Sequence, residues 1–246
     1  MATPRQPPLT RRLNRLALDG VSYRAFAIRG PCADTRYGVH ARQRASQRPG
    51  SNASVRRRYN ATMKSIPEWA RQSRAGWRYA GQERPAFAVT PKPGQRSVWD
   101  YPRPPRVERD PRQVIVRVGT VVIAHSRRSA RVLETGSPPS FYLPPEDVEL
   151  SLLKPSADRS RCEWKGEATY WTLVVSGRRF ERIAWSYLDP FPGFEDIRGC
   201  LSFYAARVEC YVDSMRVEAQ PGDFYGGWIT PEVVGPFKGV AGSEAW

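Results

Sequence analysis

From residue 114 onward, hydrophobic and polar residues alternate in short runs, which is the pattern of half-buried β-strands. Turn signals separate the runs. Two of them, Gly119-Thr120 and Ser176-Gly177, are typical of two-residue hairpin loops, so we expect antiparallel hairpins around both. The runs predict strands at residues 114–118, 121–124, 130–134, 140–143, 148–153, 168–175, 180–185, 201–204, 208–212 and 215–218.

Helical patterns are scarce in this chain. A short helix is expected near Glu68–Ala75, and one or two helical turns are expected within residues 194–200. No long amphipathic stretch and no repeat of 20 to 50 residues occurs. Many short strands at close spacing predict a mainly β fold class, with one compact domain of short antiparallel strands over residues 113–220.

Two segments flank this predicted β domain. Residues 63–112 are rich in Pro and Trp, and Pro102, Pro104 and Pro105 exclude a continuous helix or central strand there. Because flexible linkers rarely carry so many aromatic residues, we expect this arm to pack on the body. Residues 221–246 are rich in Gly and aromatic residues, and we expect them to wrap back on the sheet because aromatic side chains favour burial.

Charge is concentrated at the N-terminus. The chain carries a net charge of +15, and residues 1–62 hold thirteen Arg but only two acidic residues. We expect this segment to be a disordered basic tail or a misassigned gene start with Met63 as the true first residue, and we favour the misassigned start. A transit peptide, or a tail that binds nucleic acid or an acidic surface, would have a similar composition. The body is only mildly basic, so no specific nucleic-acid binding is predicted.

The cysteines and the hydropathy argue against a disulfide-rich protein, a zinc protein and a membrane-spanning protein. The four cysteines form no CxxC pair and no regular spacing, which is unlike a disulfide scaffold or a zinc site. No apolar run approaches the roughly 18 residues of a spanning helix, so no membrane partner is expected. A reduced, cytoplasmic protein is the expectation, or an organellar one if residues 1–62 are a transit peptide. The sequence does not give the oligomeric state.

The most informative stretch is residues 162–171, Cys-Glu-Trp-Lys-Gly-Glu-Ala-Thr-Tyr-Trp, followed by residues 184–190, Ala-Trp-Ser-Tyr-Leu-Asp-Pro. It places a lone lysine, a cysteine and two carboxylates among large aromatic residues in a region that otherwise alternates like a β-sheet. Such a combination indicates a pocket.

These residues resemble the bacterial family known as domain of unknown function 427, also labelled nucleotidyltransferase-like. The resemblance covers about residues 114–209. It implies a compact β fold similar to the β-tent of methionine sulfoxide reductase B-type proteins, and the label implies nucleotidyl transfer. Many β-tents hold zinc with two CxxC pairs, which this chain lacks, so we expect no structural zinc and name no cofactor. The resemblance rests on residues 131–135 with the Pro138-Pro139 and Pro144-Pro145 pairs, on Cys162, Lys165, Gly166, Ala168, Tyr170 and Trp171, and on residues 184–187 with Asp189-Pro190 and Phe203-Tyr204.

One spacing imitates a nucleotidyltransferase motif. Gly136-Ser137 followed by Asp147 and Glu149 matches the pattern in which Gly-Ser opens a helix for a triphosphate and the two carboxylates hold Mg²⁺. The intervening Pro144-Pro145 cannot lie inside a helix. We therefore interpret this match as a coincidence and predict no metal site.

Lys165 is the leading candidate for a catalytic residue, with Glu134 and Glu167 assisting. A buried lysine with a lowered pKa can be a base, a Schiff-base nucleophile or a phosphate partner. Alternatively, Lys165 forms a structural ion pair with Glu163, Glu167 or Glu134. The glycine at position 166 suggests a close approach of the backbone to a ligand.

Further candidates for ligand binding come from the same stretch and from more distant segments. Tyr170 and Tyr187 can present hydroxyls to a pocket, and Cys162 is either a thiol activated by Lys165 or a small core residue. Arg131 belongs to a basic cluster that is either a solvated strand end or an anion site, and Lys238 repeats the Lys-Gly pairing near the C-terminus.

Three classes of function remain open at this point. The chain is an enzyme acting on a small phosphorylated or nucleotide-like ligand, a non-catalytic small-ligand-binding domain, or a structural β domain whose aromatics are core. The partner expected in the first two classes is a small molecule in a pocket centred on Lys165.

Overall fold

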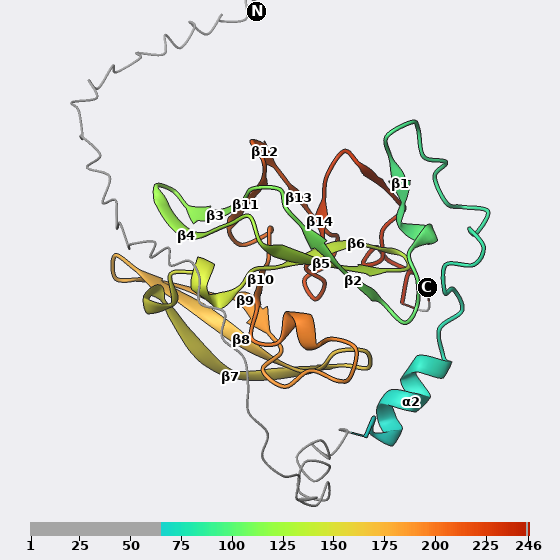
Figure 1. Ribbon diagram of the computed structural model, residues 1–246, viewed down its shortest axis with the longest axis horizontal. Helices are drawn as coiled ribbons and strands as arrows, with labels where there is room; N and C mark the ends of the chain where they lie inside the picture. Colours follow the sequence, from blue (N-terminus) through green and yellow to red (C-terminus); the bar gives the residue numbers. More distant parts are fainter. Residues whose placement is uncertain (1–64, 245) are drawn as a thin grey trace, which may run out of the picture. The chain divides into compact units, whose positions relative to one another are not determined.

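The computed structural model describes residues 65–244 and residue 246. The predicted basic tail, residues 1–62, lies outside the described residues. The described part is mainly β, as predicted, and its short strands are almost all antiparallel (Figure 1). It contains no helix long and apolar enough to cross a membrane.

The first sheet contains the predicted hairpin around Gly119-Thr120. Val114 and Val116 are fully buried, because alternate side chains of a strand point to the same face. In spatial order the strands of this sheet are β12 (Met215–Arg216), β11 (Glu209–Val212), β3 (Val114–Val118) and β4 (Val121–Ser126).

The second sheet contains the predicted turn at Ser176-Gly177, where φ is 49° and 71°, the positive values that a type I′ turn requires. The strand predicted over residues 148–153 is wrong, because a 3₁₀ turn, η3 (Leu150–Leu152), occupies most of it. A long strand that the pattern did not predict begins where this turn ends. The order in the sheet is β10 (Leu201–Phe203), β9 (Arg178–Ser186), β8 (Gly166–Val175) and β7 (Leu153–Cys162).

A third sheet and two short strand pairs complete the β structure. The third sheet runs β2 (Arg106–Asp110), β5 (Ser129–Glu134) and β6 (Ser137–Tyr142). The short pairs are β1 (Arg96–Ser97) with β15 (Val233–Val234), and β13 (Glu218–Ala219) with β14 (Trp228–Ile229). The helical segments other than η3 are α2 (Glu68–Ala75), which has the predicted bounds, and the 3₁₀ turns η1 (Val98–Asp100), η2 (Pro145–Asp147) and η4 (Glu195–Ile197).

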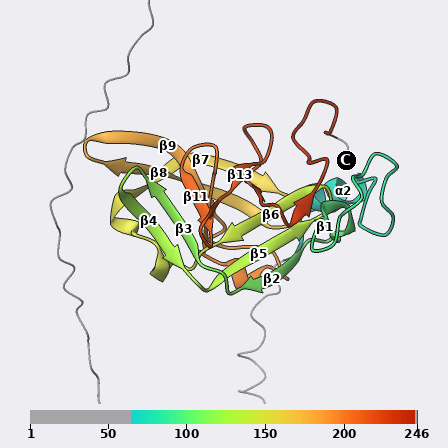
Figure 2. The ribbon, with the colours of Figure 1, turned by 90° about the horizontal axis from the view of Figure 1, so that it is seen from above.

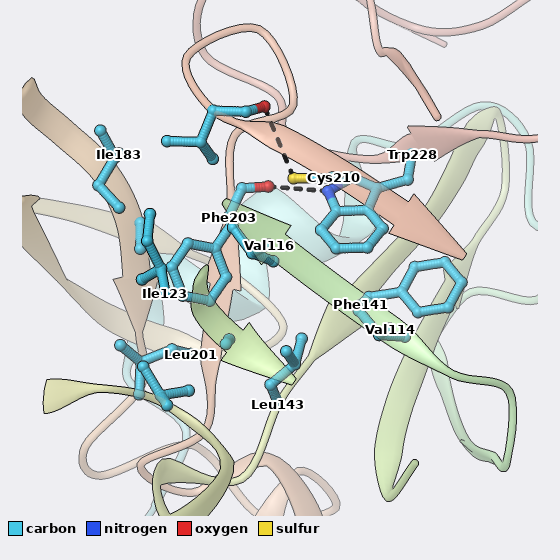
Figure 3. Packing of buried hydrophobic residues seen from close by; sticks show 14 of the residues in the cluster. Val114, Val116, Ile123, Phe141, Leu143, Ile183, Leu201, Phe203, Cys210 and Trp228 are labelled. Carbon is cyan, nitrogen blue, oxygen red and sulfur yellow. Dashed lines mark hydrogen bonds between the residues drawn. The ribbon is translucent and has the colours of Figure 1, made fainter. Parts of the chain in front are cut away.

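The main hydrophobic core lies between the first and second sheets (Figure 2). Figure 3 shows Val114 and Ile123 of the first sheet with Ile183 of the second. Trp228 comes from the C-terminal segment, is fully buried, and stacks on Phe141 with ring centroids 4.9 Å apart. Its indole N–H donates a hydrogen bond of 2.8 Å to a backbone carbonyl of β10. The C-terminal segment is therefore part of the core.

A second aromatic cluster joins the segment before β2 to the end of the chain. Trp99 is fully buried, and its ring meets those of Tyr79, Phe87 and Trp246 edge to face, at centroid distances of 5.3, 5.0 and 5.3 Å. Its indole N–H donates to the Pro236 carbonyl at 3.1 Å. These contacts hold the segment that follows α2 in place beside β5 and β6.

Candidate functional site

A cavity of about 140 Å³ lies between the second and third sheets. Its lining comes from strands β5 to β9, from Trp77 just after α2, and from the segment between residues 220 and 238. Most of the lining side chains are aromatic or polar. A cavity near this size in another protein is large enough to hold benzene, so this one suits a small molecule.

The β8–β9 pair supplies an aromatic floor. Tyr170 and Trp185 are directly opposite each other in the register of the two strands, and both are buried. The Tyr170 hydroxyl shares a hydrogen bond of 2.7 Å with the Ser160 hydroxyl, and the Trp185 indole N–H donates to the Tyr142 hydroxyl at 3.1 Å. These bonds fix the orientation of the rings that line the cavity.

Lys165 enters the cavity from the turn between β7 and β8. Cys162 and Gly166 close this turn as a strand pair, and Gly166 has a φ of +99°, a backbone conformation that residues with a side chain rarely adopt. The carbonyl of Asp189 and the ring of Phe191 face the position that a Gly166 Cβ would take, each at 3.6 Å. The turn thus suffices to explain the glycine, and the interpretation of it as a close approach to a ligand stays a prediction.

The Lys165 ammonium is buried and forms one ion pair with the described residues, with the Glu134 carboxylate at 3.7 Å. Its Nζ makes no hydrogen bond to any described residue. Burial alone would lower the pKa of Lys165, but the acidic groups around it outweigh burial and raise that pKa above its ordinary value. Cys162 and Tyr142 contribute only once they ionise, whereas the Glu134 carboxylate acts already at neutral pH. Lys165 is therefore a permanent cation at neutral pH, in contrast to the lowered pKa that we predicted.

Glu134 lies between two buried cations. Besides Lys165, it faces the Arg103 Nε at 3.4 Å. Arg103 is held by three backbone carbonyls, those of Tyr79, Trp246 and Thr135, at 2.8 to 3.0 Å. One carboxylate therefore pairs with two positive groups, and a second carboxylate, Glu163, acts on both of them from farther away without forming an ion pair.

Lys238 contributes a second buried amine to the cavity. Its backbone is fixed on both sides, because its N–H donates to the Gly136 carbonyl at 2.7 Å and its carbonyl accepts from Gln220 at 2.8 Å. Only 3% of the residue is exposed, and its Nζ lies 3.5 Å from the centroid of the Trp77 ring. That Nζ has no hydrogen bond or ion pair with any described residue.

The surroundings of Lys238 favour the neutral amine. Burial is the largest effect and repulsion by Arg103 is the next, and together they lower the pKa of Lys238 to about 8. The carboxylates of Glu134 and Glu163 oppose this change but do not cancel it. Near neutral pH the group therefore exchanges between charged and neutral forms.

The Cys162 thiol and the Tyr142 and Tyr187 hydroxyls of the cavity are neutral at physiological pH. Burial raises the pKa of the Cys162 thiol, and Lys165 offsets only part of this rise, so Cys162 is a thiol and not an activated thiolate. Burial likewise raises the pKa of Tyr142 to about 12 and that of Tyr187 well above its usual value. These hydroxyls can donate hydrogen bonds to an anion.

The structure brings most of the predicted site residues together, but not all of them. Glu134, Cys162, Lys165, Tyr170, Tyr187 and Lys238 all line the cavity. Glu167 does not, since its carboxylate is exposed and faces Arg159 at 3.9 Å. Arg131 does not either, because its guanidinium is engaged by Asp110, Glu108 and Glu232 at 3.1 to 3.4 Å.

The apparent nucleotidyltransferase motif has no matching geometry. Ser137 begins strand β6 and not a helix. Asp147 lies in a 3₁₀ turn, where it pairs with Arg128 at 2.5 Å and accepts a hydrogen bond from Ser126 at 2.6 Å. Among the described residues no group of three or more His, Cys, Asp or Glu side chains is placed to hold a metal ion.

Sequence reasoning missed several residues that shape the cavity. Trp77 is the clearest, because its indole N–H donates to Glu163 at 2.7 Å and its ring contacts both Arg103 and Lys238. Tyr225 was also missed, although the aromatic composition of its segment predicted burial. Only the tertiary fold brings these residues to the β7–β8 turn.

Comparison with known proteins supports the resemblance found in the sequence. Residues 106–214 match the family model NTP_transf_9, described as "Domain of unknown function (DUF427)". The matched range contains β2 to β11 and most of the cavity, but neither Trp77 nor Lys238. A search of curated proteins found no match.

Proposed function

We propose that this protein binds a small organic anion, of the phosphorylated or carboxylated class, in the cavity that Lys165 and Lys238 share. One observation carries the proposal: two buried lysine amines line one small cavity, and neither has a hydrogen bond to a described residue. Burying a charge without a full set of partners is costly, so such groups favour an anionic ligand.

The roles follow from the surroundings of each group. Lys165 is the permanent cation that pairs with the anionic group of the ligand, and the neutral hydroxyls of Tyr142 and Tyr187 donate hydrogen bonds. Trp77 and Trp185 supply apolar walls for a short carbon chain. The volume of about 140 Å³ favours a ligand of a few carbons over a whole nucleotide.

Thermal unfolding of the full chain tests this proposal. Phosphoglycolate is the probe, with ethylene glycol as the neutral comparison at equal ionic strength. A ligand that binds only the folded state stabilises it by about 2.7 kcal/mol at a hundredfold excess over Kd. We expect phosphoglycolate to raise the Tm of the wild type and of Lys154→Met, an exposed lysine on β7, but not that of Lys165→Met. Equal shifts in Lys154→Met and Lys165→Met would contradict a lysine-dependent site.

A further inference from the structure

We propose that Lys238 is an amine nucleophile that forms an imine with the carbonyl carbon of a small anionic aldehyde or keto acid. The inference rests on the proposed anion site and names the substrate class for it. The two lysines then have different tasks: Lys165 holds the anionic group, and Lys238 reacts with the carbonyl.

The first argument is the position of the Lys238 amine. Its backbone is fixed by hydrogen bonds on both sides, its Nζ lines the cavity, and no described residue accepts a hydrogen bond from it. An amine engaged in an ion pair would have to break that pair before attacking a carbonyl. Lys238 has none to break among the described residues and contacts the face of Trp77.

The second argument is the charge around this amine. Arg103 lies 4.1 Å from the centroid of the same Trp77 ring, so two positive groups share one indole. The Glu134 carboxylate pairs with Arg103 and Lys165, and the Glu163 carboxylate accepts a hydrogen bond from the Trp77 indole N–H. Neither carboxylate forms an ion pair with Lys238. A neighbouring cation and burial away from water are the conditions that activate lysine nucleophiles, because both favour the uncharged amine. At Lys238 these two effects outweigh the attraction of the Trp77 ring for the ammonium.

The reaction needs no further reagent. The ammonium first gives up a proton, and the free amine then attacks the carbonyl carbon to form a C–N bond. The carbonyl oxygen takes up protons and leaves as water, and a protonated imine remains. From lysine ammonium and carbonyl compound to protonated imine and water, the atoms and the charge balance, and nothing is oxidised or reduced.

Reductive trapping tests the proposal on the full chain. Glyoxylate is the probe, sodium cyanoborohydride reduces any imine, and peptide mapping by mass spectrometry locates the product. The chain has five lysines, at positions 64, 92, 154, 165 and 238. Lys92 and Lys154 are exposed and serve as internal controls. We expect labelling of Lys238 at least about tenfold faster than of either control, since near pH 8 a lysine of ordinary pKa is less than about 1% neutral.

Two further measurements show whether Lys238 is labelled because its amine is activated or only because the reagent can reach it. The labelling rate of wild-type Lys238 should rise with pH and level off with a midpoint near pH 8, the pKa that its surroundings give it. Lys165→Met should slow labelling by glyoxylate but not by acetaldehyde, which has no anionic group for Lys165 to hold. Equal labelling of Lys92, Lys154 and Lys238 would overturn the proposal.

Two readouts on the wild type distinguish this inference from the proposed function: reductive labelling reports the imine, and the rise in Tm with phosphoglycolate reports anion binding. Lys238→Arg is the control for labelling, because its guanidinium forms no trapped imine and labelling at position 238 should disappear. If phosphoglycolate stabilises the wild type but glyoxylate leaves Lys238 unmodified, the imine proposal fails and anion binding stands. If phosphoglycolate gives no stabilisation either, both proposals fail.

Discussion

Lys165 and Lys238 line the same cavity, yet their pKa values move in opposite directions. Both are buried, and burial lowers the pKa of each. The difference comes from their neighbours, since Glu134 lies 3.7 Å from Lys165 while Arg103 repels Lys238. One lysine is thus a fixed cation and the other a titratable amine, which is the pairing that imine chemistry on an anionic substrate requires.

Lys238 should make the stability of the protein depend on pH. Its pKa is 10.5 ordinarily and about 8 in the folded state. Between these pH values the unfolded chain binds more protons, so the free energy of unfolding rises with pH; below about pH 8 the full cost remains. Lys238→Met should therefore be more stable than the wild type near pH 7, by up to roughly 3 kcal/mol, and this gain should shrink near pH 10. Urea unfolding at both pH values measures the difference, and a gain that does not change with pH would contradict the assignment.

Glu134 should be the most important single charge for stability in the site. Replacing it in Glu134→Gln removes the one carboxylate that forms ion pairs with Arg103 and Lys165 and leaves them only the more distant charge of Glu163, and breaking such a buried pair typically costs about 3 kcal/mol or more. Glu167→Gln is the matched control, because its exposed ion pair at 3.9 Å contributes at most about 1 kcal/mol. Urea unfolding at neutral pH compares the two variants. A Glu134→Gln variant as stable as Glu167→Gln would show that the two cations do not depend on this carboxylate.

At the scale of elements, hairpins with clear turn signals were predictable and polar edge strands were not. The turns at Gly119-Thr120 and Ser176-Gly177 and the helix at Glu68–Ala75 follow from local sequence. Strand β7 lies at the edge of its sheet, and its residues 154–160 alternate little because most of them are exposed. Pro155 is tolerated there because the pairing with β8 is irregular between Pro155 and Arg159.

The same distinction between local and tertiary information applies to the site. Lys165 could be found from its own neighbours in sequence, because a lysine among aromatics on a strand pattern is unusual. The lowered pKa of Lys238 could not, since it depends on Trp77 and Arg103, which only the tertiary fold brings next to it. The β-tent likeness stays a prediction.

The loop that follows β13 should control the width of the cavity. Gly226 lines it, and a Cβ at this position would overlap the Trp185 indole. Gly226→Ala should force the indole or the loop to move, at a cost of about 1–3 kcal/mol, and should weaken the phosphoglycolate response. Gly76→Ala is the control, because its Cβ would meet only a backbone oxygen at 3.5 Å. Thermal unfolding with and without phosphoglycolate tests both, and equal behaviour of the two variants would rule out this close contact.

At the scale of the whole molecule, the cavity extends beyond the part that matches the family. Residues 106–214 supply Lys165, Glu134 and the aromatic floor, whereas Trp77 and Lys238 come from the flanking segments. Lys165, which we propose to hold the anion, and Lys238, the proposed nucleophile, thus come from different parts of the chain. A function assigned to the matched region alone would omit the residue that we propose to react.

The same flanking segments should also be needed for the fold. Trp228 belongs to the C-terminal segment, yet it is fully buried in the main core against Phe141. Trp228→Ala should cost about 3–5 kcal/mol, which is a large share of the 5–15 kcal/mol that typically stabilises a domain. Phe224→Ala, in the same segment but 58% exposed, should change the stability by less than about 0.5 kcal/mol. Urea unfolding measures both variants. Equal, small losses in the free energy of unfolding would show that the C-terminal segment contributes little to the stability of the core.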